Sequence, residues 1–181
     1  MKHDPACVIC SDDQGCIDAA LQGYVAKAKQ MIVKHGFMVQ GVMPDEVNHV
    51  PGYSYTIGLI DSALSVELYA CGLPPQTAQT LFNGIREQAE KGAQYSDGSV
   101  ISGMLKHGYC LMLCKVTDPP RELFAMYYNV RGAQAPLKVL QMVYPDPDGL
   151  FPWNPDFNPA IADAQRLLFT RQYGTTTGRN H

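Results

Sequence analysis

The residue types nearest the start of the chain suit metal binding. His3, Cys7, Cys10 and Cys16 lie within the first sixteen residues, and a Cys-x-x-Cys pair can place two thiolates on one tetrahedral ion. Zinc is the ion that such ligands suit, with His3 and Cys16 completing the four. A second Cys-x-x-Cys or His-x3-His pair is missing. The alternatives are a flexible reduced segment, a redox dithiol, or a site completed by later residues: Cys71, Cys110, Cys114 or His35.

A second group of polar residues lies on two expected strands, 53–59 and 65–71. If these strands pair as an antiparallel hairpin, alternation places Tyr53 and Tyr55 on one face of the sheet and Thr56 on the other. The tyrosines are candidates for ligand binding.

Glu67 lies in an otherwise apolar strand, where a carboxylate must be solvated, paired or functional. Burial can raise the pKa of such a group and make it an acid–base catalyst. The candidate catalytic residues are therefore Tyr55, Thr56, Glu67 and His35. The alternative is a structural role for Glu67, either facing solvent or paired with Arg86 or Arg121.

A Pro-rich segment near the end of the chain carries a third group. Asp146 and Asp148 form an Asp-x-Asp-Gly run that is typical of the start of a calcium loop, but the later ligands and the closing Glu are missing. A tight turn is the alternative. Trp153, the only Trp, either anchors the segment to the core or offers a binding platform. The candidate ligand-binding residues are thus Tyr53, Tyr55, Trp153, Asp146 and Asp148.

The composition limits the classes of partner. The 181 residues include 17% charged residues, fewer than usual, with a formal net charge of −3. No Lys/Arg block stands out, which argues against nucleic acid as a binding partner. No apolar run reaches membrane-spanning length, and the first residues lack the hydrophobic segment of a secretory signal. We therefore expect a cytoplasmic protein whose six cysteines mostly stay reduced.

The elements that must position these residues follow from periodicity and from Gly and Pro. Helical spacing predicts helices over 17–35, from 75 to the stop at Gly92, over 121–128 and over 160–169. Extended patterns predict strands over 37–43, 53–59, 65–71, 100–101, 109–116 and 137–144. The segment 109–116 is apolar on both faces, which is typical of a central strand.

This order of elements predicts the α+β class, with a mainly antiparallel sheet and two or three packing helices. We expect residues 1–16 to be a Cys-rich N-terminal lead and residues 17–172 to form a single domain. Residues 173–181 are expected to be a flexible C-terminal tail.

Several of these segments together resemble a bacterial family, the domain of unknown function 4262. The resemblance rests on His35-Gly36, Tyr55-Thr-Ile-Gly-Leu59, Glu67-Leu68, Gly72-Leu73-Pro74, the segment Tyr144–Trp153 and the Cys7/Cys10 pair. It covers roughly residues 7–158. One departure is Val66, where the family usually has Pro. The resemblance supports the fold boundaries and implies no activity or catalytic residues.

No complete catalytic signature is present: the sequence lacks a Gly-x-Ser-x-Gly nucleophile turn, a phosphate-binding glycine loop and His-Glu-x-x-His. We therefore favour a non-catalytic module that binds a protein or a small ligand. The alternatives are a small hydrolase using a Tyr/Thr/Glu pocket and a Cys-rich metal-binding module. The low charge also makes a homodimer an option.

Overall fold

The computed structural model describes residues 14–133 and 135–169. Its α-helices are α1 (Gln14–His35), α2 (Pro75–Glu90), α3 (Arg121–Arg131) and α4 (Pro159–Ala164). Its strands are β1 (Met38–Val42), β2 (Tyr53–Ile57), β3 (Glu67–Cys71), β4 (Val100–Ile101), β5 (Leu111–Lys115) and β6 (Val139–Val143). Two short 3₁₀ helices, η1 (Leu59–Asp61) and η2 (Lys106–Gly108), lie in connections.

The strands form one six-stranded sheet in the order β1-β2-β3-β6-β5-β4. Neighbours are antiparallel except β3 and β6, which run parallel. All five residues of β6 are buried, because it lies in the middle of the sheet. The predicted α+β class with a mainly antiparallel sheet is confirmed.

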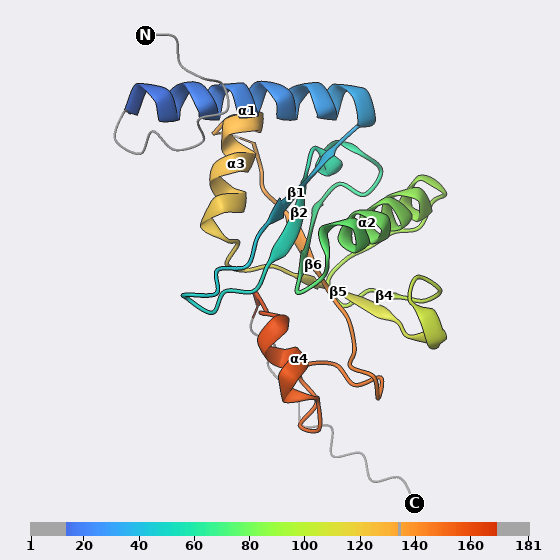
Figure 1. Cartoon of the computed structure of the whole chain (residues 1–181). Coiled ribbons are helices and arrows are strands. Elements are labelled where there is room, and N and C mark those ends of the chain that lie inside the picture. The colour runs from blue at the N-terminus through green and yellow to red at the C-terminus, as the bar shows by residue number, and fades with distance from the viewer. Residues whose placement is uncertain (1–13, 134, 170–181) are drawn as a thin grey trace, which may run out of the picture.

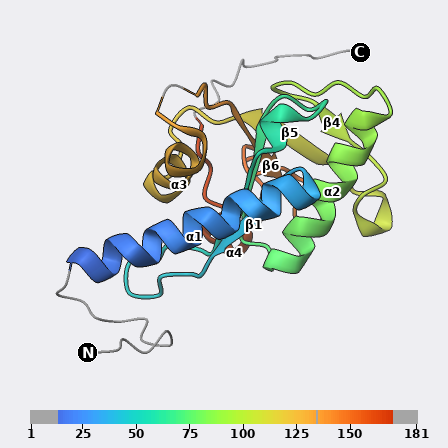
Figure 2. The same cartoon turned by 90° about the horizontal axis from the view of Figure 1, so that it is seen from above.

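Helices cover both faces of the sheet, as the view from above shows (Figure 2). On one face, α2 buries Ala78, Leu81, Phe82, Ile85 and Ala89 against the sheet, the stripe that its helical spacing predicts. On the other face, α3 contributes Leu123, Tyr127 and Val130 to a second core. The long helix α1 lies across the top of the molecule near α3 and β1 (Figure 1).

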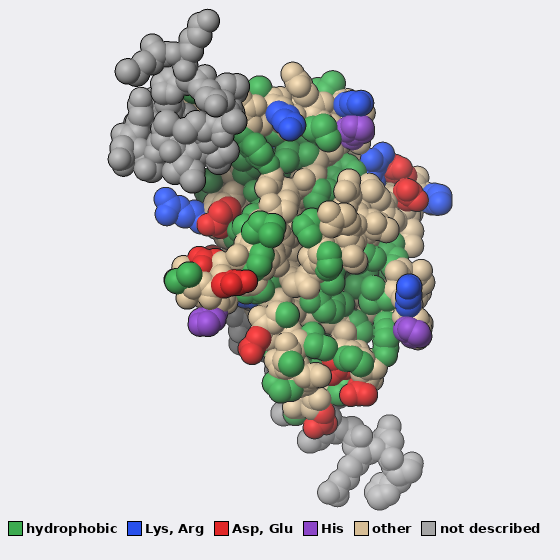
Figure 3. All heavy atoms as spheres, in the orientation of Figure 1, with side chains coloured by type: hydrophobic (Ala, Val, Ile, Leu, Met, Phe, Trp, Pro, Cys, Tyr) green, Lys and Arg blue, Asp and Glu red, His purple; other side chains and the backbone are tan. Residues whose placement is uncertain are grey.

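Few residues attach α1 to the rest of the molecule. Of its side chains from position 18 onward, only Ala28 is buried, with Val25 and Ile32 half-buried. Its apolar residues Leu21, Tyr24, Met31 and Val33 are exposed. On the face shown in Figure 3, the surface below α1 is mostly hydrophobic or uncharged. Basic side chains lie near the top of the molecule on this face.

The segment after α4 is held by a buried amide. Gln141 of β6 accepts a hydrogen bond from the Leu168 N–H and donates one to the Arg166 carbonyl, both at 2.8 Å. These bonds require extended backbone, so α4 ends at Ala164 and the helix predicted over 160–169 is shorter than expected.

In the part of the chain that the structure describes, none of the helices combines the length and the apolar character that crossing a membrane requires.

Candidate functional site

A cavity of about 540 Å³ opens between the β1–β2 connection, the start of α3 and the segment after α4. We call it the tyrosine cavity, because Tyr53 and Tyr69 line it together with Cys71. The register pairs Tyr53 with Cys71 and Tyr55 with Tyr69, so alternation brings these side chains to one face. The Tyr53 and Tyr69 rings lie 5.3 Å apart between centroids.

Charged side chains of both signs stand around the tyrosine cavity. Glu122 lies in the first turn of α3, where the helix dipole favours a carboxylate. The Tyr53 hydroxyl donates a hydrogen bond to Glu122 Oε2 at 3.0 Å. Arg121 and Arg166 line the cavity as well, and both are exposed. The cavity therefore offers a carboxylate to a hydrogen-bond donor of a ligand and guanidinium groups to an anionic group of a ligand.

Burial controls the ionisation of the inner groups. It raises the pKa of the Tyr53 hydroxyl, and the hydrogen bond to Glu122 raises it further. Burial also raises the pKa of the Cys71 thiol, although Tyr69 and the Arg166 charge lower it in part. Cys71 Sγ donates to the Ala164 carbonyl at 3.5 Å. Cys71 is thus a neutral thiol at pH 7, which does not suit a nucleophile.

Thr56 and Glu67 form a separate buried pair. Glu67 Oε2 accepts hydrogen bonds from Thr56 Oγ1 at 2.7 Å and from the Leu59 N–H at 3.2 Å. Glu67 Oε1 accepts from the N–H groups of Gly58 at 2.8 Å and Ile60 at 3.4 Å. Burial raises the pKa of the carboxyl, while these donors lower it in part.

The role of this pair is to fix a turn. The Thr56 hydroxyl accepts from the Leu68 N–H at 2.8 Å, so its proton points to Glu67, which suits a carboxylate. Gly58 has φ +100°, and a Cβ there would lie 3.2 Å from the Gly36 carbonyl. Glu67 therefore holds the start of η1 in a place where α1 approaches closely.

The structure does not bring the four candidate catalytic residues to one cavity. Tyr55 is buried, with its hydroxyl 3.5 Å from the Glu122 carbonyl. Thr56 and Glu67 are fully buried around η1. His35 is exposed at the end of α1, where its carbonyl accepts from Arg86 Nη1 at 3.2 Å.

The candidates in the Pro-rich segment form a structural turn in the described chain. Asp146 is buried and accepts hydrogen bonds from the N–H groups of Asp148, Leu150 and Asn158 at 2.9–3.0 Å. Asp148 is exposed. Trp153 is half-buried and stacks on Phe151 with centroids 5.0 Å apart. These residues do not line the tyrosine cavity.

The predicted metal ligands cannot be placed. His3, Cys7 and Cys10 lie outside the described residues, as does the side chain of Cys16. Zinc binding there stays a prediction. Among the described residues, no three His, Cys, Asp or Glu side chains are grouped so that they could hold a metal.

Sequence reasoning selected Tyr53 but missed its neighbours Tyr69, Glu122 and Arg166, and it considered Cys71 only as a metal ligand. The alternation of Tyr69 and Cys71 opposite Tyr53 was a usable signal once the hairpin was expected. The approach of Glu122 and Arg166 had no such signal, because it depends on how α3 and the segment after α4 pack on the sheet.

Comparison with known families gives one result. A family model described as a domain of unknown function (DUF4262) matches residues 31–158, well over half of the chain. Searches of curated proteins and of solved structures gave no match.

Proposed function

This chain belongs to the DUF4262 family, a domain of unknown function, and we propose that it is a non-catalytic module that binds a small polar ligand in the tyrosine cavity. The observation that carries the proposal is the combination of two aromatic lining residues, Tyr53 and Tyr69, with the charged lining residues Glu122 and Arg166. Ligand sites are typically concave, with apolar walls and a few polar groups that fix orientation.

The size and the charges suggest what the ligand carries. A volume of about 540 Å³ lies in the range of small-molecule sites. Glu122 Oε2 already accepts from Tyr53, and its carboxylate can also take a donor or a cation from the ligand. Arg166 can hold an anionic group. The proposed ligand is therefore a small molecule with a cationic or donor group and an anionic group, as in an amino acid.

The chemistry of the lining favours binding over turnover. Catalysis by Cys71 would need a thiolate, whereas burial raises the pKa of this thiol. Glu67 accepts hydrogen bonds from Thr56 and from the backbone at the start of η1, and neither Thr56 nor Glu67 lines the cavity. A cytoplasmic location is part of the proposal; Cys71 and Cys110 carry thiols, which suits a reducing compartment.

The test combines native mass spectrometry of the fresh protein with thermal unfolding against free amino acids, dipeptides and nucleotides. A ligand at one hundred times its dissociation constant adds about 2.7 kcal/mol to the unfolding free energy, which raises Tm by about 5–10 °C. Glu122→Gln should remove most of this shift. Glu87→Gln, an exposed glutamate on α2, is the matched control.

Two results would contradict the proposal. One is a ligand that raises the Tm of the Glu122→Gln variant by as much as it raises the Tm of the unchanged protein. The other is chemical conversion of the bound molecule, seen as a new product mass, which would make the protein an enzyme. The same native spectra report the oligomeric state, which tests the homodimer.

A further inference from the structure

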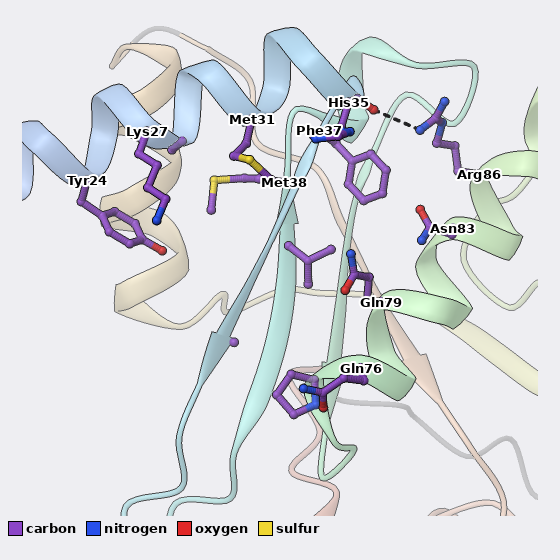
Figure 4. A pocket seen from close by; sticks show the side chains of 14 residues that line it. Tyr24, Lys27, Met31, His35, Phe37, Met38, Gln76, Gln79, Asn83 and Arg86 are labelled. Carbon is purple, nitrogen blue, oxygen red and sulfur yellow. Dashed lines mark hydrogen bonds between the residues drawn. The ribbon is translucent and has the colours of Figure 1, made fainter.

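A second hollow, of about 530 Å³, runs along the free edge of β1 between α1 and α2. We call it the edge groove. Figure 4 shows β1 passing between Tyr24, Lys27 and Met31 of α1 and the amide side chains of Gln79 and Asn83 on α2. The groove is separate from the tyrosine cavity: of the described residues, none lines both.

The backbone of β1 faces the groove at two positions. The Gly52 carbonyl accepts from the Gly72 N–H at 2.8 Å, so the even-numbered residues of this segment bond toward β3. Because the bonding direction alternates along a strand, Tyr53, Tyr55 and Ile57 bond toward β1. Their partners in the register are Val42, Gln40 and Met38.

The remaining residues of β1, Val39 and Gly41, therefore direct their N–H and C=O groups away from the sheet. A hydrogen bond agrees with this assignment: Gln40 Nε2 donates to the Gly41 carbonyl at 2.5 Å, which requires that carbonyl to face outward. Val39 and Gly41 also line the edge groove. The Val39 N–H, the Val39 C=O and the Gly41 N–H are thus available to an added strand.

Three of the usual protections of an edge strand are missing from β1, although α1 and α2 flank it. Natural edges are blunted by charged side chains, proline, bulges or a covering element. The five residues of β1, Met-Val-Gln-Gly-Val, include no charge and no proline, and the register with β2 runs without a bulge. An open and regular edge of this kind is the structure that binds peptides by strand addition.

The side chains of the edge groove favour acidic partners. Lys27 and Arg86 line it, and none of the described lining residues is acidic, although the whole chain has a formal charge of −3. Arg86 shares its charge with Glu90 at 2.7 Å. Met31 of α1 and Met38 of β1 offer apolar contacts, and Gln79 and Asn83 of α2 offer amide donors.

We propose that the edge groove binds an acidic, extended segment of a partner protein, which adds to β1 as a further strand of the sheet. Alternate residues of an added strand face opposite sides. Apolar residues of the partner face the methionines, and carboxylates face Asn83 and Arg86. Lys27 on the α1 side adds a positive charge that attracts the acidic segment as a whole. The recognised segment therefore alternates apolar and acidic residues.

A second copy of this chain is a poorer occupant of the same edge. In a two-fold symmetric dimer, the β1 strands of the two copies would pair, and the same residues of both copies would line the interface. Lys27 and Arg86 of both copies would then gather in one interface, with Glu90 beside Arg86 as the nearby counter-charge and none beside Lys27 among the described lining residues. Like charges at such short range cost free energy, whereas an acidic segment gains it.

The test measures fluorescence anisotropy of a labelled peptide that alternates Glu and Val, beside a peptide in which Lys replaces Glu. The full chain should bind the acidic peptide and not the basic one. Val39→Pro removes an outward N–H without touching the bonds to β2, so binding should weaken about tenfold. Val39→Ala keeps that N–H and should bind nearly normally.

A matched pair of variants on α1 tests whether the positive charge of the groove contributes to binding. Lys27→Glu should weaken binding of the acidic peptide severalfold, with a smaller effect at high salt. Lys29→Glu, on the same helix but outside the groove, should leave binding unchanged.

Amide hydrogen exchange completes the test without any variant. The Val39 and Gly41 amides should become protected when the acidic peptide binds, which also covers the case in which Val39→Pro fails to fold. Equal binding of both peptides, or unchanged exchange at these amides, would overturn the proposal. So would a concentration-dependent dimer that protects them in the absence of peptide, since the occupant would then be a second copy.

Discussion

At the scale of single residues, two hydroxyls on the same side of β2 differ in their hydrogen bonds. The Thr56 hydroxyl joins the Leu68 N–H to the Glu67 carboxylate. Thr56→Val keeps the shape but leaves both groups short of a partner, and unsatisfied buried groups cost about 1–3 kcal/mol each. We expect the unfolding free energy in urea to fall by about 2–4 kcal/mol. Thr56→Ser keeps the hydroxyl and should lose only about 1 kcal/mol; equal losses would contradict the role of the hydroxyl.

Ser54 provides the opposite case two positions away. Its Oγ is buried without a hydrogen-bond partner among the described residues. Removing an unsatisfied buried group relieves its desolvation cost, so Ser54→Ala should leave stability unchanged or raise it by about 1 kcal/mol. The measurement is the same urea titration. A loss above about 1 kcal/mol would mean that the Ser54 hydroxyl has a partner, such as a buried water.

At the scale of elements, the end of β3 meets the end of α4 at Gly72. This residue has φ +73°, and a Cβ there would lie 2.7 Å from the Tyr144 hydroxyl and closer still to the Ala164 carbonyl. Gly72→Ala should therefore displace α4 and lower Tm by more than Gly92→Ala. Gly92 has φ +99° but open space around it, so only the backbone cost of about 1–2 kcal/mol applies there. Similar Tm losses for the two variants would contradict this contact.

The elements that could be predicted are those with a local signal. The stripe of α2 predicted both the helix and its buried face, and Gly92 predicted its end. The segment 160–169 shows where local signals fail. Its second half is extended because Gln141, far away in sequence, binds the backbone there. The segment 109–116 is a second example. Its apolar pattern predicted a central strand, but β5 has only the short strand β4 on its outer side, and β6 occupies the middle.

At the scale of the molecule, the functional surfaces depend on distant pairings that local patterns do not contain. The parallel β3–β6 pair joins segments about seventy residues apart and sets where α3 and the segment after α4 pack. The tyrosine cavity arises from that packing, so Tyr53 could be predicted as a candidate while Glu122 and Arg166 could not. The same holds for the edge groove, since the order of strands decides that β1 is outermost.

Stability against acid is also a property of the whole molecule, because several carboxyl groups change their pKa on folding. Asn48 lowers the pKa of Asp45, and Arg131 lowers that of Asp61. Burial alone would raise the pKa of Asp146, but the N–H groups of Asn158, Leu150 and Asp148 bring it below its usual value. The pKa of Glu67 changes in the opposite direction, because burial raises it.

The sign for Asp146 follows from linkage. A carboxyl whose pKa is lower in the folded state stabilises the fold fully above the unfolded pKa of about 3.9, and this stabilisation is lost as pH falls through the folded pKa. Asp146→Asn removes this titration. The difference in unfolding free energy between the unchanged protein and the variant should be constant from about pH 7 to pH 5 and shrink below about pH 4. Asp148→Asn, at an exposed position in the same turn, is the control, and a difference that does not change with pH would show that Asp146 acts through packing rather than charge.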